Sequence, residues 1–211
     1  MKISMTDAGK RFNRDWIFRH FTKDFFTGQT YAITGHNGSC KSTLLQVIAG
    51  AIALSEGNMD FFEGDKKIDA ESQYMQVAIC APYLELIEEM SAQEFLDFHR
   101  QFKPLKEDGT SELLAEVELD HAAKKQIRYF SSGMKQRLKL AQAIFSVSPV
   151  LLLDEPCTNL DKNGIALYHR LIEKYCRAKL IIVSSNDEVE YSFCKEIISI
   201  QDFKQAVGSR Q

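Results

Sequence analysis

Apolar residues along the chain follow two different spacings, one typical of strands and one typical of helices. Up to about residue 62 the pattern favours strands, as in residues 17–26 and 31–34. From about residue 84 it becomes helical, and beyond residue 145 short apolar strands alternate with helices. The other predicted elements are a helix after residue 41 that stops at Gly50, a strand at 58–62, helices at 111–119 and 134–145, a strand at 150–153, a helix at 165–175 and a strand at 180–184.

The clearest helix start lies at Ser91, because Glu94 three residues later completes a capping box. Phe95, Phe98 and Phe102 follow on one face of this helix. The alternation of strands and helices further on is typical of a parallel α/β core. We therefore predict one domain over residues 1–211, with a core at about 1–83 and 146–211 and an inserted helical subdomain at about 84–145.

Composition narrows the possible functions. The 211 residues carry 26 basic and 29 acidic side chains, a net charge of −3, which disfavours nucleic acid as a partner. No apolar run approaches the roughly 18 residues that cross a bilayer. The five cysteines are widely spaced and show no metal-binding pattern, so we expect free thiols in a reducing cytoplasm.

A glycine-rich segment follows the strand at 31–34 and opens the next helix, which is the setting of a phosphate-binding P-loop. We expect Lys41 to reach the β- and γ-phosphates of a nucleotide and Ser42 to place its hydroxyl on Mg²⁺. Cys40 stands where the usual pattern has glycine, and its thiol is expected near the phosphates. The candidate ATP-binding residues of this loop are Gly35, His36, Asn37, Gly38, Ser39, Cys40, Lys41, Ser42 and Thr43. The alternative is an ordinary glycine-rich turn.

Two carboxylates end the apolar strand at 150–153. Asp154 is the candidate Mg²⁺ ligand, and Glu155 is the candidate general base that polarises the attacking water. The alternative is a strand that ends in polar residues at a turn before Pro156.

The order of motifs resembles the nucleotide-binding domain of ABC ATPases. The matching segments are the P-loop, Phe130-Ser131-Ser132-Gly133-Met134-Lys135-Gln136-Arg137, Asp154-Glu155-Pro156 and Thr158-Asn159-Leu160-Asp161, and the resemblance runs from about residue 12 to 186. It implies an α/β fold: a P-loop NTPase core with a mostly parallel sheet, an N-terminal antiparallel β part and an inserted helical subdomain. It also implies a head-to-tail dimer, in which the signature residues Ser131, Ser132 and Gly133 of one subunit meet the ATP of the other. Asp161 matches the aspartate that couples the two sites.

Further positions are assigned by the same resemblance. Phe12 falls where the family stacks an aromatic ring on adenine, with Trp16 as the second candidate and core packing as the alternative for both. Pro82 occupies the position of the Q-loop glutamine, and Tyr83 or Glu85 could substitute for it. Asn186 occupies the position of the switch histidine and is expected to bind the γ-phosphate by hydrogen bonding alone. Asn186 is therefore counted with Lys41 and Glu155 as a candidate catalytic residue.

We predict an ATP-binding and ATP-hydrolysing subunit of an ABC transporter, with Mg²⁺ as cofactor. Its expected partners are a second nucleotide-binding domain and a separate integral membrane subunit, and its expected place is the cytoplasmic, inner face of the membrane. The loop at 83–90 is the expected contact with the membrane subunit, although its apolar residues could equally pack into the core. The alternatives are a non-hydrolysing nucleotide sensor, suggested by Cys40, Pro82 and Asn186, and a soluble ABC ATPase acting on ribosomes or DNA.

Overall fold

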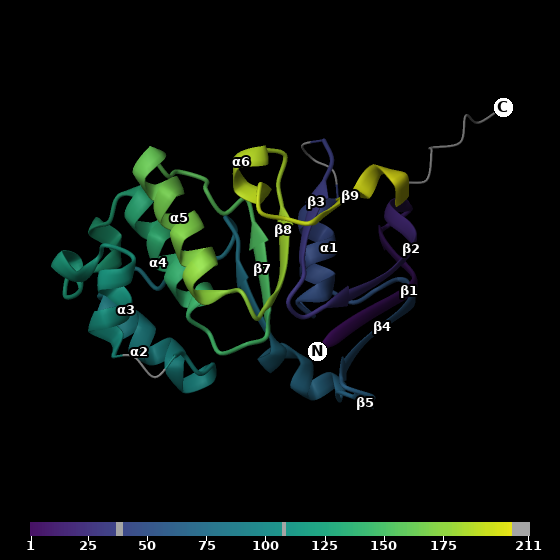
Figure 1. The fold of residues 1–211 in the computed structure, drawn as a ribbon, viewed down its shortest axis with the longest axis horizontal. Coiled ribbons are helices and arrows are strands. Elements are labelled where there is room, and N and C mark those ends of the chain that lie inside the picture. Colours follow the sequence, from purple (N-terminus) through teal and green to yellow (C-terminus); the bar gives the residue numbers. More distant parts are fainter. Residues whose placement is uncertain (37–39, 107–108, 204–211) are drawn as a thin grey trace.

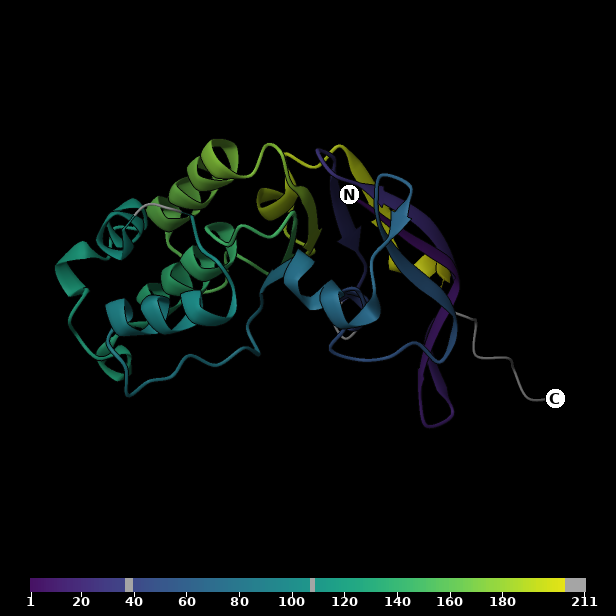
Figure 2. The ribbon, with the colours of Figure 1, turned by 90° about the horizontal axis from the view of Figure 1, so that it is seen from below.

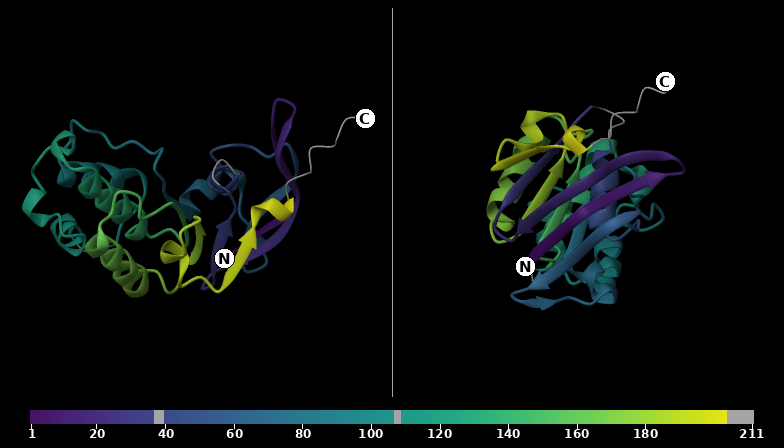
Figure 3. Two further views of the ribbon diagram at one scale, coloured as in Figure 1. Left: turned by 90° about the horizontal axis from the view of Figure 1, so that it is seen from above. Right: turned by 90° about the vertical axis from the view of Figure 1, so that its right-hand side faces the viewer.

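A computed structural model describes residues 1–36, 40–106 and 109–203. The molecule is elongated, with a helical part at one end, a parallel sheet in the middle and an antiparallel sheet at the other end (Figures 1 and 3). The predicted fold class, an α/β core with an N-terminal antiparallel part and a helical insertion, is confirmed.

The antiparallel sheet contains the first strands of the chain, and its face is turned toward the viewer on the right of Figure 3. A long hairpin of the first two strands forms one side of the sheet, and the third of its strands pairs with the free side of the first. The order is β2-β1-β4-β5, with β1 at Lys2–Phe12, β2 at Asp15–Phe26, β4 at Glu56–Glu63 and β5 at Lys66–Lys67.

The central sheet is parallel throughout its described pairings, so the carboxyl ends of its strands lie along one edge. Its order is β6-β7-β8-β3-β9, with β3 at Thr30–Thr34, β6 at Val77–Cys80, β7 at Val150–Asp154, β8 at Leu180–Ser184 and β9 at Glu196–Ser199. Ser184 pairs with Asp154 on one side and with Ile33 on the other. This register brings the ends of β7, β8 and β3 to the same level.

The helices cover both faces of the parallel sheet and build the lobe beside it (Figure 2). Three α-helices fall within the predicted insertion at 84–145, and α5 packs against the last of them. The α-helices are α1 at Lys41–Ile48, α2 at Ala92–Phe102, α3 at Thr110–Glu116, α4 at Ser132–Ile144, α5 at Lys162–Tyr175 and α6 at Glu188–Tyr191; the 3₁₀ turns are η1 at Ala70–Gln76, η2 at Asp120–Ala122, η3 at Ile127–Tyr129 and η4 at Ile200–Phe203.

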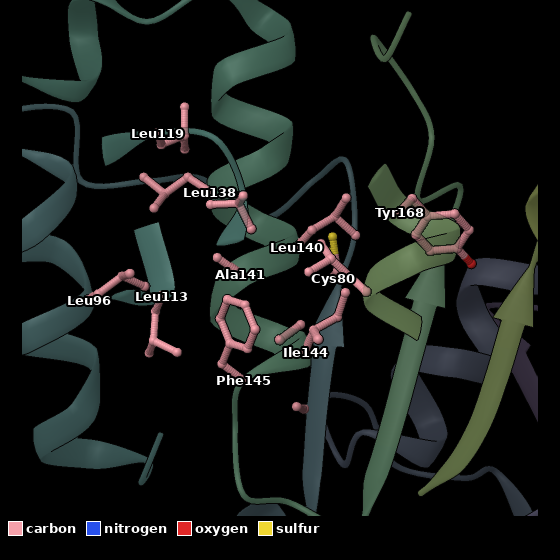
Figure 4. Close-up of a cluster of buried hydrophobic side chains, with 14 of the residues drawn as sticks. Cys80, Leu96, Leu113, Leu119, Leu138, Leu140, Ala141, Ile144, Phe145 and Tyr168 are labelled. Atoms are coloured by element: carbon pink, nitrogen blue, oxygen red, sulfur yellow. The ribbon is translucent and has the colours of Figure 1, made fainter. Parts of the chain in front are cut away.

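Two apolar cores lie on opposite faces of the parallel sheet. One core is formed by helices α2, α3, α4 and α5 and one face of the sheet; in it, Leu140 and Ile144 of α4 lie near Cys80 of β6, whereas Leu138 points toward Leu119 (Figure 4). The other joins α1, the antiparallel sheet and the opposite sheet face, with Phe21, Leu45 and Ile182 among its members. Because α1 is fixed in this second core, its first residue, Lys41, is held near Gly35 at the end of β3.

The sequence signals for the helix that starts after Ser91 can be compared with the structure. The capping box at Ser91 and Glu94 forms as predicted, with the Ser91 hydroxyl accepting the Glu94 N–H. On the aromatic face of α2, Phe95 is buried, whereas Phe98 and Phe102 are exposed and meet edge to face with their ring centroids 5.0 Å apart. A sequence pattern shows which residues share a face but not how much of that face meets the core.

No helix among residues 1–36, 40–106 and 109–203 is long and apolar enough to cross a membrane.

Candidate functional site

The candidate site lies at the carboxyl edge of the parallel sheet. Gly35 follows β3, Glu155 follows β7 and Asn186 follows β8, and the register described above places these three strand ends side by side. In open α/β sheets this edge is where ligands bind. The structure thus brings together the P-loop, the paired carboxylates and the switch position.

Lys41 is the first residue of α1, and only 4% of it is exposed. Its ammonium group donates to the carbonyl oxygen of Gly35 at 2.7 Å and, more weakly, to that of His36 at 3.5 Å. The side chain is thus folded back over its own loop, where it can bind phosphate oxygens. Ser42 and Thr43 follow in the first turn of the helix and are partly exposed, while Asn37, Gly38 and Ser39 lie outside the described residues.

Cys40 immediately precedes α1 and Lys41 and is only 8% exposed. It belongs to the apolar core formed by α1 and the two sheets. The side chain that replaces the usual glycine is thus accommodated by packing against this core, and its contact with the phosphates stays a prediction.

Asp154 ends β7, and only 2% of it is exposed. Its Oδ1 atom accepts a hydrogen bond from the Ser184 hydroxyl at 2.7 Å, which fixes the carboxylate at the sheet edge. Mg²⁺ is commonly held by one or two carboxylates together with hydroxyl and phosphate oxygens. Asp154 and the hydroxyl of Ser42 fit such a donor set. The described residues form no group of three or more His, Cys, Asp and Glu suited to a metal, and a nucleotide-dependent Mg²⁺ site needs none.

Glu155 follows at once and is exposed at the edge. Its φ angle is +43°, in the left-handed region that non-glycine residues rarely adopt. Its backbone N–H donates to the Ser184 carbonyl at 2.9 Å, and its own carbonyl accepts the Thr158 N–H at 3.2 Å. This turn of the chain holds the carboxylate outside the strand, where it can meet a water molecule.

Asn186 reaches across to the P-loop. Its Oδ1 atom accepts the backbone N–H of Gly35 at 3.2 Å. The switch position and the first residue of the phosphate loop are therefore in direct contact.

The signature residues lie at the start of α4. The Ser131 hydroxyl caps this helix by accepting the Met134 N–H at 3.3 Å, and Ser131 and Ser132 are exposed. A Cβ atom on Gly133 would lie 3.2 Å from the Asn159 carbonyl oxygen, so glycine permits this close approach. A surface pocket of about 370 Å³ is lined by Ser131, Ser132, Gly133, Asn159 and Asp161 among others.

Asp161 begins α5, where its carboxylate accepts the Gly164 N–H at 2.8 Å. Arg137 of α4 lies 4.0 Å from the same carboxylate and also pairs with Glu118 at 2.7 Å. Asp161 is thus a helix cap that still faces the signature pocket.

Comparison with known proteins decides the family. A family model described as ABC transporter matches residues 18–158. The chain belongs to the ABC transporter family. Among its relatives, an uncharacterised ABC transporter ATP-binding protein, YybJ of Bacillus subtilis, is 30% identical over 91% of this chain and 89% of its own. The cytochrome c biogenesis ATP-binding export protein CcmA of Nitrobacter winogradskyi is 33% identical over 75% of this chain and 78% of its own.

The fold agrees with this family. A bacterial ABC transporter cassette solved as a dimer superposes with a TM-score of 0.80, covers 93% of each chain and is 20% identical. The prediction of an ABC transporter ATP-binding subunit is confirmed by the family match and by these relatives.

At the family's adenine-stacking position, Phe12 lies at the end of β1, next to the β1–β2 turn, with 47% of it exposed. The Lys10 ammonium group lies 5.0 Å from its ring centroid. Trp16 is engaged elsewhere, because the Arg19 guanidinium lies 4.5 Å from its ring and a Cβ on Gly9 would meet the ring at 3.0 Å. Phe12 is therefore the aromatic ring with a surface available to a base.

At the Q-loop position of the ABC family, Pro82 and Tyr83 are both exposed. The Tyr83 hydroxyl hydrogen-bonds Gln46 of α1. Burial raises the pKa of the Tyr83 phenol, the hydrogen bond to Gln46 acts in the opposite direction, and the nearby Asp154 carboxylate raises the pKa further. Tyr83 is therefore close enough to Asp154, the candidate Mg²⁺ ligand, to interact with its charge. The sequence had left open whether Tyr83 or Glu85 takes the place of the Q-loop glutamine.

The loop at 83–90 is divided between core and surface. Leu86 is buried and Met90 packs against the helical core, whereas Tyr83, Leu84 and Ile87 are exposed. Three buried polar residues beside the site had no signal in the sequence: Ser184, which holds Asp154, and Gln136 and Glu190, which contact the chain just after Glu155. Each looks like an ordinary helix or strand residue until the fold brings it to the edge.

Proposed function

We propose that this chain is the ATP-hydrolysing subunit of an ABC transporter and drives transport through a separate membrane subunit. The observation that supports this most strongly is the single sheet edge that carries Lys41, Asp154, Glu155 and Asn186. Together, these residues supply a cation for the phosphates, a metal ligand, a base and a hydrogen-bonding side chain at the same edge of the sheet.

In this proposal, Lys41 and the N–H groups at the start of α1 bind the β- and γ-phosphates. Ser42 and Asp154 hold Mg²⁺, which neutralises charge on the phosphate oxygens. Glu155 orients the attacking water and accepts its proton. Asn186 hydrogen-bonds the γ-phosphate without a change of charge, and Phe12 stacks on the adenine.

A second copy of the domain completes the site in the proposal. Ser131, Ser132 and Gly133 lie at the exposed start of α4, where helix N–H groups favour an anion. A bacterial cassette with the same fold was solved as a dimer, which supports the pairing of two copies, and the head-to-tail arrangement is what the family resemblance implies. Asp161 would then face the partner's site.

The membrane subunit is expected to dock on exposed apolar side chains of the helical part and the loop before it. Tyr83, Leu84 and Ile87 of the loop are exposed, and so are Phe98 and Phe102 of α2, whose rings meet edge to face. Neighbouring exposed apolar side chains, such as those of the loop, are typical of interaction sites. Docking there would hold the protein on the cytoplasmic face of the membrane.

The decisive experiment is Glu155→Gln, with ATP binding and phosphate release measured on the same preparation. We expect binding to persist, turnover to fall nearly to zero and an ATP-bound dimer to accumulate on a sizing column. Glu173→Gln is the matched control, because the same change at this exposed ion pair with Arg177 should leave turnover unchanged. Wild-type turnover in Glu155→Gln would contradict the role of this carboxylate, and no phosphate release from the wild type would favour a non-hydrolysing nucleotide sensor.

A further inference from the structure

The peptide group between Pro156 and Cys157 is held on both sides by buried side chains. Its carbonyl oxygen accepts a hydrogen bond from Nε2 of Gln136 at 2.7 Å. Its N–H donates to Oε1 of Glu190, also at 2.7 Å. Gln136 is 3% exposed and Glu190 is 5% exposed, so neither bond competes with solvent. Two side chains from different helices thus fix the plane of one peptide.

This peptide follows directly after Glu155. Glu155 has a left-handed backbone at φ +43°, a conformation that a non-glycine residue keeps only when its surroundings enforce it. The Glu155 N–H is fixed on the strand side by the Ser184 carbonyl. The clamped Pro156–Cys157 peptide supplies the restraint on the other side.

Glu190 also contacts the segment that carries Asn186. Its carboxylate hydrogen-bonds the Ser185 side chain, one residue before Asn186. The Tyr168 hydroxyl donates to the Glu190 carbonyl oxygen at 2.9 Å and ties α6 to α5. Burial raises the pKa of Glu190, the hydrogen bonds from Ser185 and Cys157 oppose the rise, and the carboxylates of Asp187 and Glu155 add to it.

Gln136 makes the same peptide sensitive to the signature helix. It lies on α4, which begins at the signature serines, and its side-chain nitrogen also lies 3.8 Å from the Cys80 sulfur at the end of β6. A shift of α4 would therefore act on the peptide that follows Glu155.

We propose that Gln136 and Glu190 are positioning residues for ATP hydrolysis, because together they fix the Pro156–Cys157 peptide and thereby the carboxylate of Glu155. Glu190 does the same for Asn186 through Ser185. This inference rests on the proposed hydrolytic function and assigns neither residue a contact with ATP.

The test compares Gln136→Met, which removes the donor at similar volume, with Glu190→Ala and Glu190→Gln. Ser148→Ala is the matched control, since the buried Ser148 hydroxyl donates to the Met75 carbonyl at 2.9 Å before the amino end of β7, away from the site. For each variant, kcat, KM, Mg·ADP affinity, melting temperature and hydrogen–deuterium exchange of residues 155–161 are measured.

We expect Gln136→Met and Glu190→Ala to lower kcat by about tenfold or more, since small misplacements of reacting groups cost up to about 10²-fold in rate. KM and ADP affinity should change little, and amide exchange of residues 155–161 should accelerate. Glu190→Gln keeps an oxygen that accepts the Cys157 N–H, so it should restore most of kcat. Ser148→Ala should lower the melting temperature while kcat and exchange at 155–161 stay as in the wild type.

The outcomes separate this inference from the proposed function. If the wild type hydrolyses ATP and both disruptive variants match Ser148→Ala in kcat and exchange, the positioning role is wrong and the proposed function stands. If the loss appears only in nucleotide affinity, the positioning role is likewise wrong. A wild type without ATPase activity would overturn both proposals, whatever the exchange data show.

Discussion

The side-chain oxygen of Asn186 accepts a hydrogen bond from the backbone N–H of Gly35 at 3.2 Å. The residue at the switch position thus contacts the phosphate loop directly, and it does so through a group that does not titrate in the neutral range. This contact is one route by which a change at the γ-phosphate can reach the end of β8.

Asn186→Ala should slow hydrolysis with little effect on ADP affinity. A hydrogen bond to a charged group contributes about 1.5–3 kcal/mol, or roughly ten- to hundredfold in rate if it forms mainly in the transition state. Asn186→His should preserve activity. The measurement is turnover per folded molecule, with Ser91→Ala, which removes the cap of α2, as a control that lowers only the melting temperature. A fall in melting temperature with unchanged turnover for Asn186→Ala would leave this residue a structural role only.

Tyr83→Phe, at the Q-loop position, should raise the Mg²⁺ concentration that hydrolysis requires. The change removes the hydroxyl that bonds Gln46 near Asp154 while keeping the ring. A lost neutral hydrogen bond of about 0.5–1.5 kcal/mol corresponds to roughly a two- to tenfold rise in the Mg²⁺ concentration needed for half-maximal turnover. Tyr129→Phe, at another exposed tyrosine, provides the comparison and should leave the Mg²⁺ titration unaltered. Superimposable titrations for the two variants would contradict a role for the Tyr83 hydroxyl.

Thiol labelling of the native protein should be slow at Cys40 with or without nucleotide. Its side chain is buried in the core formed by α1 and the two sheets. Mass spectrometry after alkylation, with unfolded protein as the control in which all five cysteines react, measures this. Rapid labelling that Mg·ATP suppresses would instead place the thiol at the phosphates.

The stability of the protein should fall as the pH rises above about 9. Burial raises the pKa of Cys80, Cys157 and Cys194 from 9.0 to about 12 each. In the unfolded chain these thiols lose their protons from about pH 9, whereas in the folded protein they keep them to about pH 12. Each thiol therefore reduces the free energy of unfolding by up to about 1.4 kcal/mol per pH unit within this window.

Urea unfolding at pH 8, 9 and 10 tests the alkaline prediction. Cys80→Ala should show a shallower decline than the wild type, because one titrating thiol is missing. Buried Lys179, whose pKa burial lowers from 10.5 to about 8, acts in the opposite direction between those values. Because Lys179 is present in both the wild type and Cys80→Ala, its contribution cancels when the two pH slopes are compared. Equal slopes for the two proteins would contradict the contribution of Cys80.

The sequence predicted the parts of the site whose chemistry depends on spacing along the chain. The P-loop follows β3 and the carboxylates end β7, so a parallel sheet necessarily brings Lys41 and Asp154 to one edge. The cap at Ser91 was equally predictable, because all of its atoms lie within four residues. Strand β9 was missed because four residues at 196–199 carry too short a pattern to distinguish.

The remaining features depend on contacts between distant segments. The sequence does not show that Cys40 packs in the core around α1, and in the sequence Gln136 is one polar residue of an amphipathic helix. Glu190 contacts Cys157 across 33 residues of sequence, which no local pattern encodes. The burial of these groups follows from tertiary packing, so it could not be predicted from the sequence.

Strand β3, which carries the phosphate loop, pairs with β8 on one side and with β9 on the other. Both neighbours come from residues 180–199, whereas β3 lies at residues 30–34. During translation, β3 can therefore pair with β8 and β9 only after residues 180–199 have left the ribosome. Until then, the apolar residues Tyr31 and Ile33, which are buried in the folded protein, lack these neighbouring strands. We therefore expect nucleotide affinity to appear only late in synthesis, and we expect a polypeptide stalled before residue 180 to expose apolar surface rather than to bind ATP.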